Sequence, residues 1–261
     1  MTFAGDHVQL EIVVPAYNEA KRLPRGLSLL LRKLRDLPVP AAVLVVDNAS
    51  TDETSAIVRD WATTAPVRLL HCPERGKGAA VRMGLLATRA PYVGFCDADM
   101  ATDLSSLDDV LRLMAEGHSM VVGSRRHPDS VVEEYGRPLR RLGAIVFNRL
   151  VRDLAGGAAD TQCGFKFFSG PLVRAAAADL RTPGFAFDVE LLMHCIRHGG
   201  VVTDLPVVWR DVPGTTFSVR RHTVRCARDL ARIRATARRP ATTYAPTRSL
   251  VLSETSGTGP G

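Results

Sequence analysis

The sequence has no long hydrophobic run, and this absence limits the classes of protein to which it can belong. Among its 261 residues, no apolar stretch reaches the length that a membrane-spanning helix needs, about 18 to 20 residues. The N-terminus also lacks a basic segment followed by an apolar run and a small-residue cleavage site, the pattern of a secretory signal peptide. We therefore expect a cytoplasmic protein without a membrane span.

Paired cysteines are absent as well. The sequence has five cysteines, an odd number, and none belongs to a Cys-x-x-Cys pair: Cys72, Cys96, Cys163, Cys195 and Cys226. This spacing argues against a disulfide framework and against a zinc cluster. We expect the cysteines that lie in apolar runs to behave as small hydrophobic side chains.

Excess charge is confined to one segment. The chain carries a net charge of +7, and residues 217–240, with eight arginines and one aspartate, account for all of it. Because the rest of the chain is balanced, we expect no nucleic-acid partner. A single basic segment instead indicates a local anionic surface, such as phospholipid headgroups or the phosphate of an acceptor. A solvated arginine-rich helix is the alternative interpretation of this segment.

The hydrophobic pattern predicts one α/β domain. Short apolar runs alternate with amphipathic stretches in the first half, which indicates a mostly parallel sheet with helices on both faces. The predicted strands of this half are residues 10–15, 41–47, 67–72, 92–96 and 119–123. The predicted helices of this half are residues 19–37, 51–61, 78–88 and 105–116.

The second half of the chain is less regular. Its predicted helices are residues 138–154, 187–198 and 217–239, and its predicted strands are residues 164–168 and 201–209. Residues 241–261 are rich in threonine, serine, glycine and proline, so we expect a disordered tail there. The folded part is therefore predicted to be a single domain over residues 1–240.

Four polar clusters follow the first four predicted strands, at residues 15–19, 47–52, 75–78 and 97–99. Taken one at a time, each has a structural explanation as a turn, a helix cap or a solvated strand end. The carboxyl ends of parallel strands meet at one edge of a sheet, which is where ligands of such folds bind. The sequence therefore predicts one binding site built from all four clusters.

The residue types in these clusters suit a nucleotide with a diphosphate group. The carboxylate of Asp47 can accept hydrogen bonds from a base, and helix N-termini can hold phosphate oxygens. Gly76 and Gly78 allow the backbone to approach a ligand closely, and Lys77 adds positive charge. Asp97 and Asp99 offer two hard oxygen ligands on one extended segment, which suits Mg²⁺ or Mn²⁺ bridged to a diphosphate.

These motifs resemble those of the family 2 inverting glycosyltransferases, which have a GT-A fold. The resemblance is carried by the segments VVPAYNE, VVDNASTDET, RGKGAAVRMG and DADMATD. Residues 160–166 (DTQCGFK), 122–125 (VGSR) and 187–192 (FDVELL) are similar to the dolichyl- and polyprenyl-phosphate sugar synthases, especially the dolichyl-phosphate β-glucosyltransferases. The resemblance covers residues 9–220, which is most of the predicted domain.

The resemblance implies a division of the domain and a set of roles. It implies a nucleotide-binding half (8–125), an acceptor half (126–216) and the basic helix (217–240). The residues that it places along the nucleotide sugar are Pro15, Ala16, Tyr17, Glu19, Asp47, Lys77, Asp97, Ala98 and Asp99. Within this set, Asp47 would contact the base with Lys77 close to it, Asp97 would touch the ribose or the metal ion, and Asp99 would bind the metal ion.

A second set of residues is implied to surround the reacting sugar or the acceptor. Its members are Arg125, Arg141, Gln162 and Lys166, with Arg137 and Arg140 competing for the place of Arg141. Arg125 and Lys166 are expected to take part in catalysis. In some relatives a late loop closes over the diphosphate, which implies phosphate contacts for Arg220 and Arg221 and a metal contact for His222. A simple surface role is the alternative for His222.

Two departures from the family pattern bear on the substrates. Many lipid-phosphate mannosyl synthases carry glutamine two places after the second aspartate, where this chain has Ala101. Because the glucosyl branch also differs there, Ala101 favours UDP-glucose over GDP-mannose as donor. Membrane-spanning segments are common in the glucosyl branch, and their absence from this sequence argues against a lipid acceptor.

The nature of the acceptor decides whether a general base is needed. We expect a polyprenyl phosphate, which is already ionised, with the basic helix lying on the inner face of the membrane. A small-molecule hydroxyl is the alternative acceptor, and it would need a carboxylate base, for which Asp188 and Glu190 are candidates. The structural explanation of Asp188 is that it caps a helix.

A nucleotide-sugar-binding or nucleotidyltransferase-like protein is the third interpretation. Nucleotidyltransferases also place paired metal carboxylates on an α/β sheet, but they usually begin with a glycine-rich loop after the first strand. Residues 15–24 (PAYNEAKRLP) contain no glycine. The sequence therefore favours a metal-dependent glycosyltransferase over this class.

Overall fold

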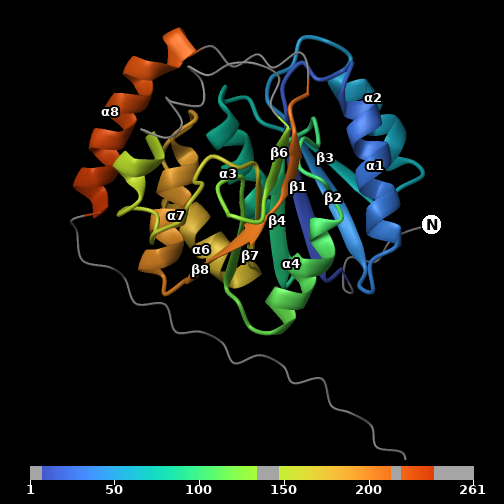
Figure 1. Ribbon diagram of the computed structural model, residues 1–261. Coiled ribbons are helices and arrows are strands. Elements are labelled where there is room, and N and C mark those ends of the chain that lie inside the picture. Colours follow the sequence, from blue (N-terminus) through green and yellow to red (C-terminus); the bar gives the residue numbers. More distant parts are fainter. Residues whose placement is uncertain (1–7, 134–146, 213–218, 238–261) are drawn as a thin grey trace, which may run out of the picture.

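The computed structural model describes residues 8–133, 147–212 and 219–237, and in the last range it describes the side chains from Cys226 onward. A seven-stranded sheet runs through these ranges and is covered by helices on both faces (Figure 1). This arrangement confirms the predicted α/β architecture.

The central sheet has the strand order β3-β2-β1-β4-β7-β5-β8. The bounds of its strands are β1 (Leu10–Ala16), β2 (Ala41–Asp47), β3 (Val67–His71), β4 (Tyr92–Cys96), β5 (Met120–Ser124), β7 (Phe165–Ser169) and β8 (Val202–Pro206). Neighbouring strands pair in parallel except around β7, which runs antiparallel to both β4 and β5. The reversed β7 therefore begins at the edge of the sheet where β4 and β5 end.

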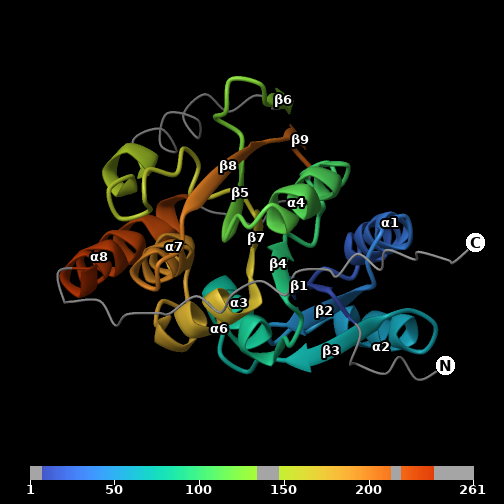
Figure 2. The ribbon, with the colours of Figure 1, turned by 90° about the horizontal axis from the view of Figure 1, so that it is seen from below.

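Helices from both halves of the chain cover the two faces of the sheet (Figure 2). Their bounds are α1 (Leu23–Arg35), α2 (Thr54–Ala62), α3 (Lys77–Ala87), α4 (Ser106–Ala115), α6 (Gly170–Asp179), α7 (Phe187–Arg197) and α8 (Val219–Ala237). One buried cluster joins the sheet to α1, α2 and α4, and a second joins it to α3, α6 and α7. A parallel ribbon of β6 (Val131–Glu133) and β9 (Val208–Arg210) lies beside the main sheet.

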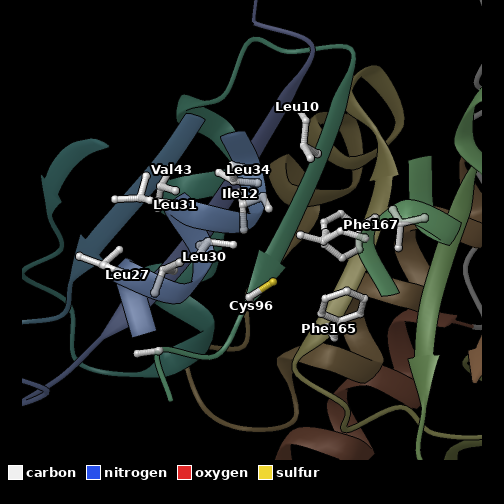
Figure 3. Close-up of a cluster of buried hydrophobic side chains, with 14 of the residues drawn as sticks. Leu10, Ile12, Leu27, Leu30, Leu31, Leu34, Val43, Cys96, Phe165 and Phe167 are labelled. Atoms are coloured by element: carbon white, nitrogen blue, oxygen red, sulfur yellow. The ribbon is translucent and has the colours of Figure 1, made fainter. Parts of the chain in front are cut away.

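The first strand shows how the sequence builds both layers. Ile12 and Val14 point into the cluster beneath α1, whereas Val13 points into the cluster on the opposite face. Leucines of α1 pack over the first of these faces (Figure 3). Because alternate residues of a strand face opposite sides of a sheet, a continuous apolar run is what a strand buried on both faces requires.

Several predicted boundaries differ from the structure for local reasons. The first helix begins at Leu23 rather than at residue 19, because residues 19–22 form a turn and Pro24 fits the first helical turn. The second helix begins at Thr54, whose N–H donates to Asp52 Oδ1 at 3.0 Å. The predicted strand 201–209 divides into β8 and β9, and α6 was not predicted at all.

The basic helix α8 packs against the domain with its apolar side. Leu230 and Ile233 are buried in one cluster with Val189 and Met193 of α7. Leu230 and Ile233 therefore face protein, and the contact of the basic helix with a membrane stays a prediction. Among the described residues, no helix is both long and apolar enough to cross a membrane.

Two of the predicted segments fall largely outside the described residues. Of the predicted helix 138–154, the structure describes the part from residue 147, which is helical over 147–151. The predicted tail, residues 241–261, lies wholly outside, so its disorder stays a prediction.

Candidate active site

The predicted site lies at the edge of the sheet where β1, β2 and β4 end. The loop before β7 reaches this edge too, because β7 is reversed and Phe165 pairs with Cys96, the last residue of β4. The backbone N–H of Asp97 donates to the carbonyl of Gly164 at 3.1 Å. The DAD segment and the segment before β7 are therefore neighbours in space although they are far apart in the sequence.

The turns after β1 and β2 hold each other through side-chain bonds. The N–H of Asn18 donates to Ser50 Oγ at 3.0 Å, and the N–H of Thr51 donates to Asn18 Oδ1 at 2.8 Å. The N–H of Glu19 donates to Thr54 Oγ1 at 2.9 Å. Beside them, the ring of Tyr17 is 42% exposed, which leaves a face for stacking.

Asp47 organises the second turn from a buried position. Its carboxylate accepts hydrogen bonds from the N–H of Ser50 (3.2 Å) and from Ser55 Oγ (2.6 Å), and it lies 3.2 Å from His71 Nδ1. Burial acts to raise the pKa of Asp47, but the bonds from Ser50 and Ser55 hold it below its usual value. The structure thus gives Asp47 the supporting role of a turn residue, and its contact with a base stays a prediction.

Gly76 and Gly78 of the third cluster allow another backbone segment, residues 182–184, to approach closely. A Cβ at Gly76 would lie 2.1 Å from the carbonyl oxygen of Pro183, and one at Gly78 would lie 2.3 Å from that of Thr182. The N–H groups of Gly78 and Ala79 donate to Pro183 at 2.9 and 3.3 Å. The close approach predicted for a ligand is therefore made by residues 182–184, which cap the start of α3.

Lys77 lies beside the metal-binding candidate Asp97. Its Nζ is 2.5 Å from Asp97 Oδ1, and it lies over the ring of Phe187 at 5.8 Å. The carboxylate of Asp97 also lies against Gly164, since a Cβ there would be 2.1 Å from Asp97 Oδ2. Asp97 is 39% exposed, so it can still reach a ligand.

Asp99 completes the aspartate pair. Its Oδ1 accepts a hydrogen bond from the N–H of Ala101 at 3.2 Å, and the side chain of Ala98 between the two aspartates is buried. Burial raises the pKa of Asp99, and the nearby charge of Asp97 raises it further. The two carboxylates therefore interact electrostatically, and their sharing of a cation stays a prediction.

Sequence analysis missed Arg22, which joins this group. Its Nε and Nη2 donate to the two carboxylate oxygens of Glu19 at 2.7 and 2.5 Å. Its Nη1 is buried without a hydrogen-bond partner in the part of the chain that the structure describes. Asp97 and Asp99 act electrostatically on both Arg22 and Glu19, so the arginine belongs to the same edge of the sheet. The position of Arg22, three residues after Glu19, was the available signal.

Arg125 and Gln162 lie in the part of the site that the resemblance assigns to the acceptor, called the acceptor side below. Arg125 Nε and Nη2 donate to the buried carboxylate of Asp160 at 2.7 and 3.0 Å, and the guanidinium lies over the ring of Trp209 at 5.4 Å. Asp160 also accepts from the N–H of Gln162 at 3.1 Å. Gln162 Nε2 is a buried donor with no hydrogen-bond partner among the described residues. Asp160 and Trp209 were not predicted as site residues.

Lys166 and Asp188 form a buried ion pair. Lys166 Nζ donates to Asp188 Oδ1 at 2.6 Å and to the carbonyl of Cys163 at 2.5 Å, and the side chain of Lys166 is 0% exposed. In this structure Lys166 holds Asp188, and its predicted place around the reacting sugar or the acceptor stays a prediction. Asp188 is not the helix cap, because the N-cap of α7 is Ala186 and no side chain caps it, but Asp188 lies in the first turn, where a negative charge favours the helix N-terminus.

The remaining predicted residues divide into two groups. Glu190 accepts hydrogen bonds from the N–H groups of Thr182 (2.7 Å) and Arg181 (3.3 Å), so it supports the loop that caps α3. Arg141 lies outside the described residues, as do the side chains of Arg220, Arg221 and His222 in the first part of α8, so their roles stay predictions.

The donor set suits a divalent cation that also binds phosphate. Among the described residues no three His, Cys, Asp or Glu side chains gather around one point. Mg²⁺ commonly takes one or two protein carboxylates and completes its coordination with phosphate oxygens and water. Asp97 and Asp99 fit that pattern.

The fold and the site together define an enzyme class, the glycosyltransferases with a GT-A fold. The family model described as glycosyl transferase family 2 matches residues 11–176. The match spans more than half of the chain, and the chain belongs to this family.

Related proteins have similar sequences over most of their length. The dolichyl-phosphate beta-glucosyltransferase of Dictyostelium discoideum is 32% identical over 244 residues, which are 88% of this chain and 75% of that protein. The protein of the same name from Homo sapiens is 35% identical over 226 residues, which are 79% of this chain and 69% of that protein.

Solved structures share the fold at low sequence identity. A glucosyl-3-phosphoglycerate synthase from Mycobacterium tuberculosis, in complex with Mn²⁺ and uridine-diphosphate-glucose, has a TM-score of 0.63 at 20% identity. The match covers 88% of this chain and 79% of that chain. S. aureus TarS 1-349 in complex with UDP-GlcNAc has a TM-score of 0.56 at 17% identity, over 81% of this chain and 62% of that chain.

Proposed function

We propose that this glycosyltransferase moves a glucosyl residue from UDP-glucose to a polyprenyl phosphate with the help of Mg²⁺ or Mn²⁺. The named activity of the two relatives above supports the acceptor and the sugar. The complexes of the structural neighbours with UDP-glucose and Mn²⁺ or with UDP and Mg²⁺ support the donor and the ion. Ala101, which replaces the glutamine of many mannosyl synthases, agrees with a glucosyl donor.

The ion pair of Lys166 and Asp188 is the observation that favours one class of acceptor over the other. A hydroxyl acceptor needs a carboxylate that can reach it and take its proton. The candidate carboxylate, Asp188, is buried and bonded to a fully buried lysine. An acceptor that is already ionised needs no such base, so this arrangement favours a phosphate over a hydroxyl.

Cationic and polar groups on the acceptor side suit a phosphate. Arg125 is held in a fixed orientation by Asp160 and Trp209, and Asp160 also holds Gln162, whose Nε2 is a buried donor without a hydrogen-bond partner among the described residues. We assign both residues to positioning the acceptor phosphate. Arginine suits this task because its planar group keeps its charge and its geometry.

The chemical step is an in-line displacement with inversion. An oxygen of the acceptor phosphate forms a bond to the anomeric carbon while the bond from that carbon to the diphosphate breaks. The electron pair of the broken bond leaves with UDP. A divalent ion, when bound, neutralises the charge that develops on the leaving diphosphate. Asp97 and Asp99 would hold this ion, and Lys77 adds charge beside them.

We also propose peripheral contact with an anionic membrane at its cytoplasmic face. Since the apolar side of α8 is buried, the contact would be made by its arginines, of which Arg228 and Arg232 are exposed. Arginines near an anionic surface gain about 1 kcal/mol each. The basic segment, which holds the whole net charge, supports this proposal.

A transfer assay tests the proposed reaction. The protein is incubated with radiolabelled UDP-glucose, Mn²⁺ and polyprenyl phosphate in detergent, and the label in the lipid fraction is counted. We expect label in the lipid that depends on the metal ion and disappears in Asp99→Asn. Radiolabelled GDP-mannose replaces UDP-glucose in a parallel reaction, in which we expect no label in the lipid. Label that reaches only small hydroxyl compounds or water would contradict the proposal.

A further inference from the structure

Lys77 occupies the place of a cation beside a metal-binding carboxylate. Its Nζ is 2.5 Å from Asp97 Oδ1, and its side chain is 21% exposed. We propose that Lys77 is a built-in counter-ion of the metal site, which holds Asp97 until the divalent ion takes its place. This inference rests on the proposed use of a metal ion.

The charges at the edge of the sheet indicate that Lys77 and a divalent ion compete for the carboxylate of Asp97. Carboxylates there are matched with cations in the pairs Glu19–Arg22, Asp97–Lys77, Asp160–Arg125 and Asp188–Lys166. Asp99 has no ion pair at contact distance among the described residues, although the charges of Arg22 and Lys77 act on it, and it interacts with Asp97. The single positive charge of Lys77 compensates only part of the charge of Asp97 and Asp99, whereas a divalent ion on both would balance the pair. The ion therefore has a reason to displace the lysine.

A second anion lies within reach of the displaced lysine. The charge of Asp188 acts on Lys77 as well, after that of Asp97, and the ammonium lies over the ring of Phe187. The backbone of Lys77 is held in place, because the next two N–H groups donate to Pro183. The movement is therefore confined to a flexible side chain with four methylene groups.

This arrangement gives Lys77 a task at both ends of the catalytic cycle. Without the metal ion, the ammonium relieves the repulsion between Asp97 and Asp99. With the ion bound, the ammonium is released toward Asp188 and the diphosphate. When UDP and the ion leave, the return of Lys77 to Asp97 opposes their rebinding.

Metal affinity without nucleotide is the measurement that tests this role. Binding of Mn²⁺ to the full chain is followed by electron paramagnetic resonance for wild type, Lys77→Met and Lys77→Arg. The matched control is Lys33→Met, which removes a lysine paired with Asp108 at 2.6 Å outside the site. We expect Lys77→Met to bind Mn²⁺ about fivefold more tightly, as suits the loss of a partly exposed ion pair. Lys77→Arg and Lys33→Met should match wild type.

The outcomes separate this inference from the proposed function. Equal or weaker Mn²⁺ binding by Lys77→Met, with wild-type binding intact, overturns the counter-ion role and leaves the transfer reaction standing. No Mn²⁺ binding by wild type, with or without UDP, overturns both. Thermal unfolding checks that each variant is folded, and Lys77→Gln replaces Lys77→Met if the latter is not.

Discussion

The donor side and the acceptor side of the site use charged residues differently. On the donor side, Asp97 is half-exposed and its partner Lys77 is flexible, so both can exchange partners when a ligand arrives. On the acceptor side, Lys166 and Asp188 are sealed together in the core, and Asp160 is buried under Arg125. A charged residue in a family motif can therefore contact the substrate or hold another residue, and burial distinguishes the two.

Breaking the sealed pair should have the largest effect on stability. Lys166→Met leaves the carboxylate of Asp188 buried without its partner, which costs about 3–5 kcal/mol. The double variant Lys166→Met with Asp188→Asn removes both charges and should recover much of this loss. Urea unfolding measures both values. A loss below about 1 kcal/mol in the single variant is the value of a solvent-exposed ion pair and would contradict the burial of this pair.

Two glycine substitutions compare a glycine that packs against backbone, Gly78, with one that packs against a side chain, Gly164. Gly78→Ala brings a Cβ to 2.3 Å from a backbone oxygen, so we expect a loss of about 2–3 kcal/mol in unfolding free energy. Gly164→Ala meets the carboxylate of Asp97 instead, which can turn away at less cost. We therefore expect Gly164→Ala to keep more stability but to bind Mn²⁺ less tightly, by about tenfold. Equal effects of both variants on both quantities would contradict this distinction.

The buried Asp160 should contribute to the pH dependence of stability. Burial acts to raise the pKa of Asp160, but Arg125 offsets this and holds it below the usual value. A carboxyl group whose pKa is lower in the folded state stabilises above its unfolded pKa, about 4, and loses that contribution as the pH falls through the folded pKa. Asp160→Asn should cost about 1.5–2 kcal/mol at pH 7 and flatten the loss of stability below pH 4. Unfolding curves at several pH values check this, and an unchanged acid limb would count against it.

The smallest effect concerns the exposed arginines of α8. Arg228→Gln removes one exposed charge of the basic segment and should weaken binding to anionic vesicles about fivefold. Arg59→Gln on α2, also an exposed arginine, is the matched control and should leave binding unchanged. Vesicle sedimentation at low salt measures both. Equal losses in the two variants would indicate a diffuse charge effect rather than a surface on α8.

The sequence predicted the donor side better than the acceptor side. Strands β1, β2 and β4 contain apolar runs that end in polar turns, so both the sheet and the paired aspartates could be predicted. The helix α6 was missed although Pro171 near its start and its alanines are helix signals. The burial of Lys166 could not be predicted, because its partner Asp188 is 22 residues away and meets it only through the reversed strand β7.

The contacts of some turns could not be predicted from the sequence either. The motif around Gly76 predicted an approach to a ligand, but nothing local shows that residues 182–184 fill that place. Arg22 is closer to its motif, three residues after Glu19, and its bidentate bond could have been proposed from spacing alone. Long-range partners therefore account for most of the errors.

The binding of UDP with and without Mn²⁺, compared between wild type and Asp99→Asn by isothermal titration calorimetry, tests most directly whether the aspartate pair holds an ion for the diphosphate. The account predicts that Mn²⁺ strengthens UDP binding to wild type by at least about tenfold and has little effect on the variant. A variant that keeps the full effect of Mn²⁺ would contradict it.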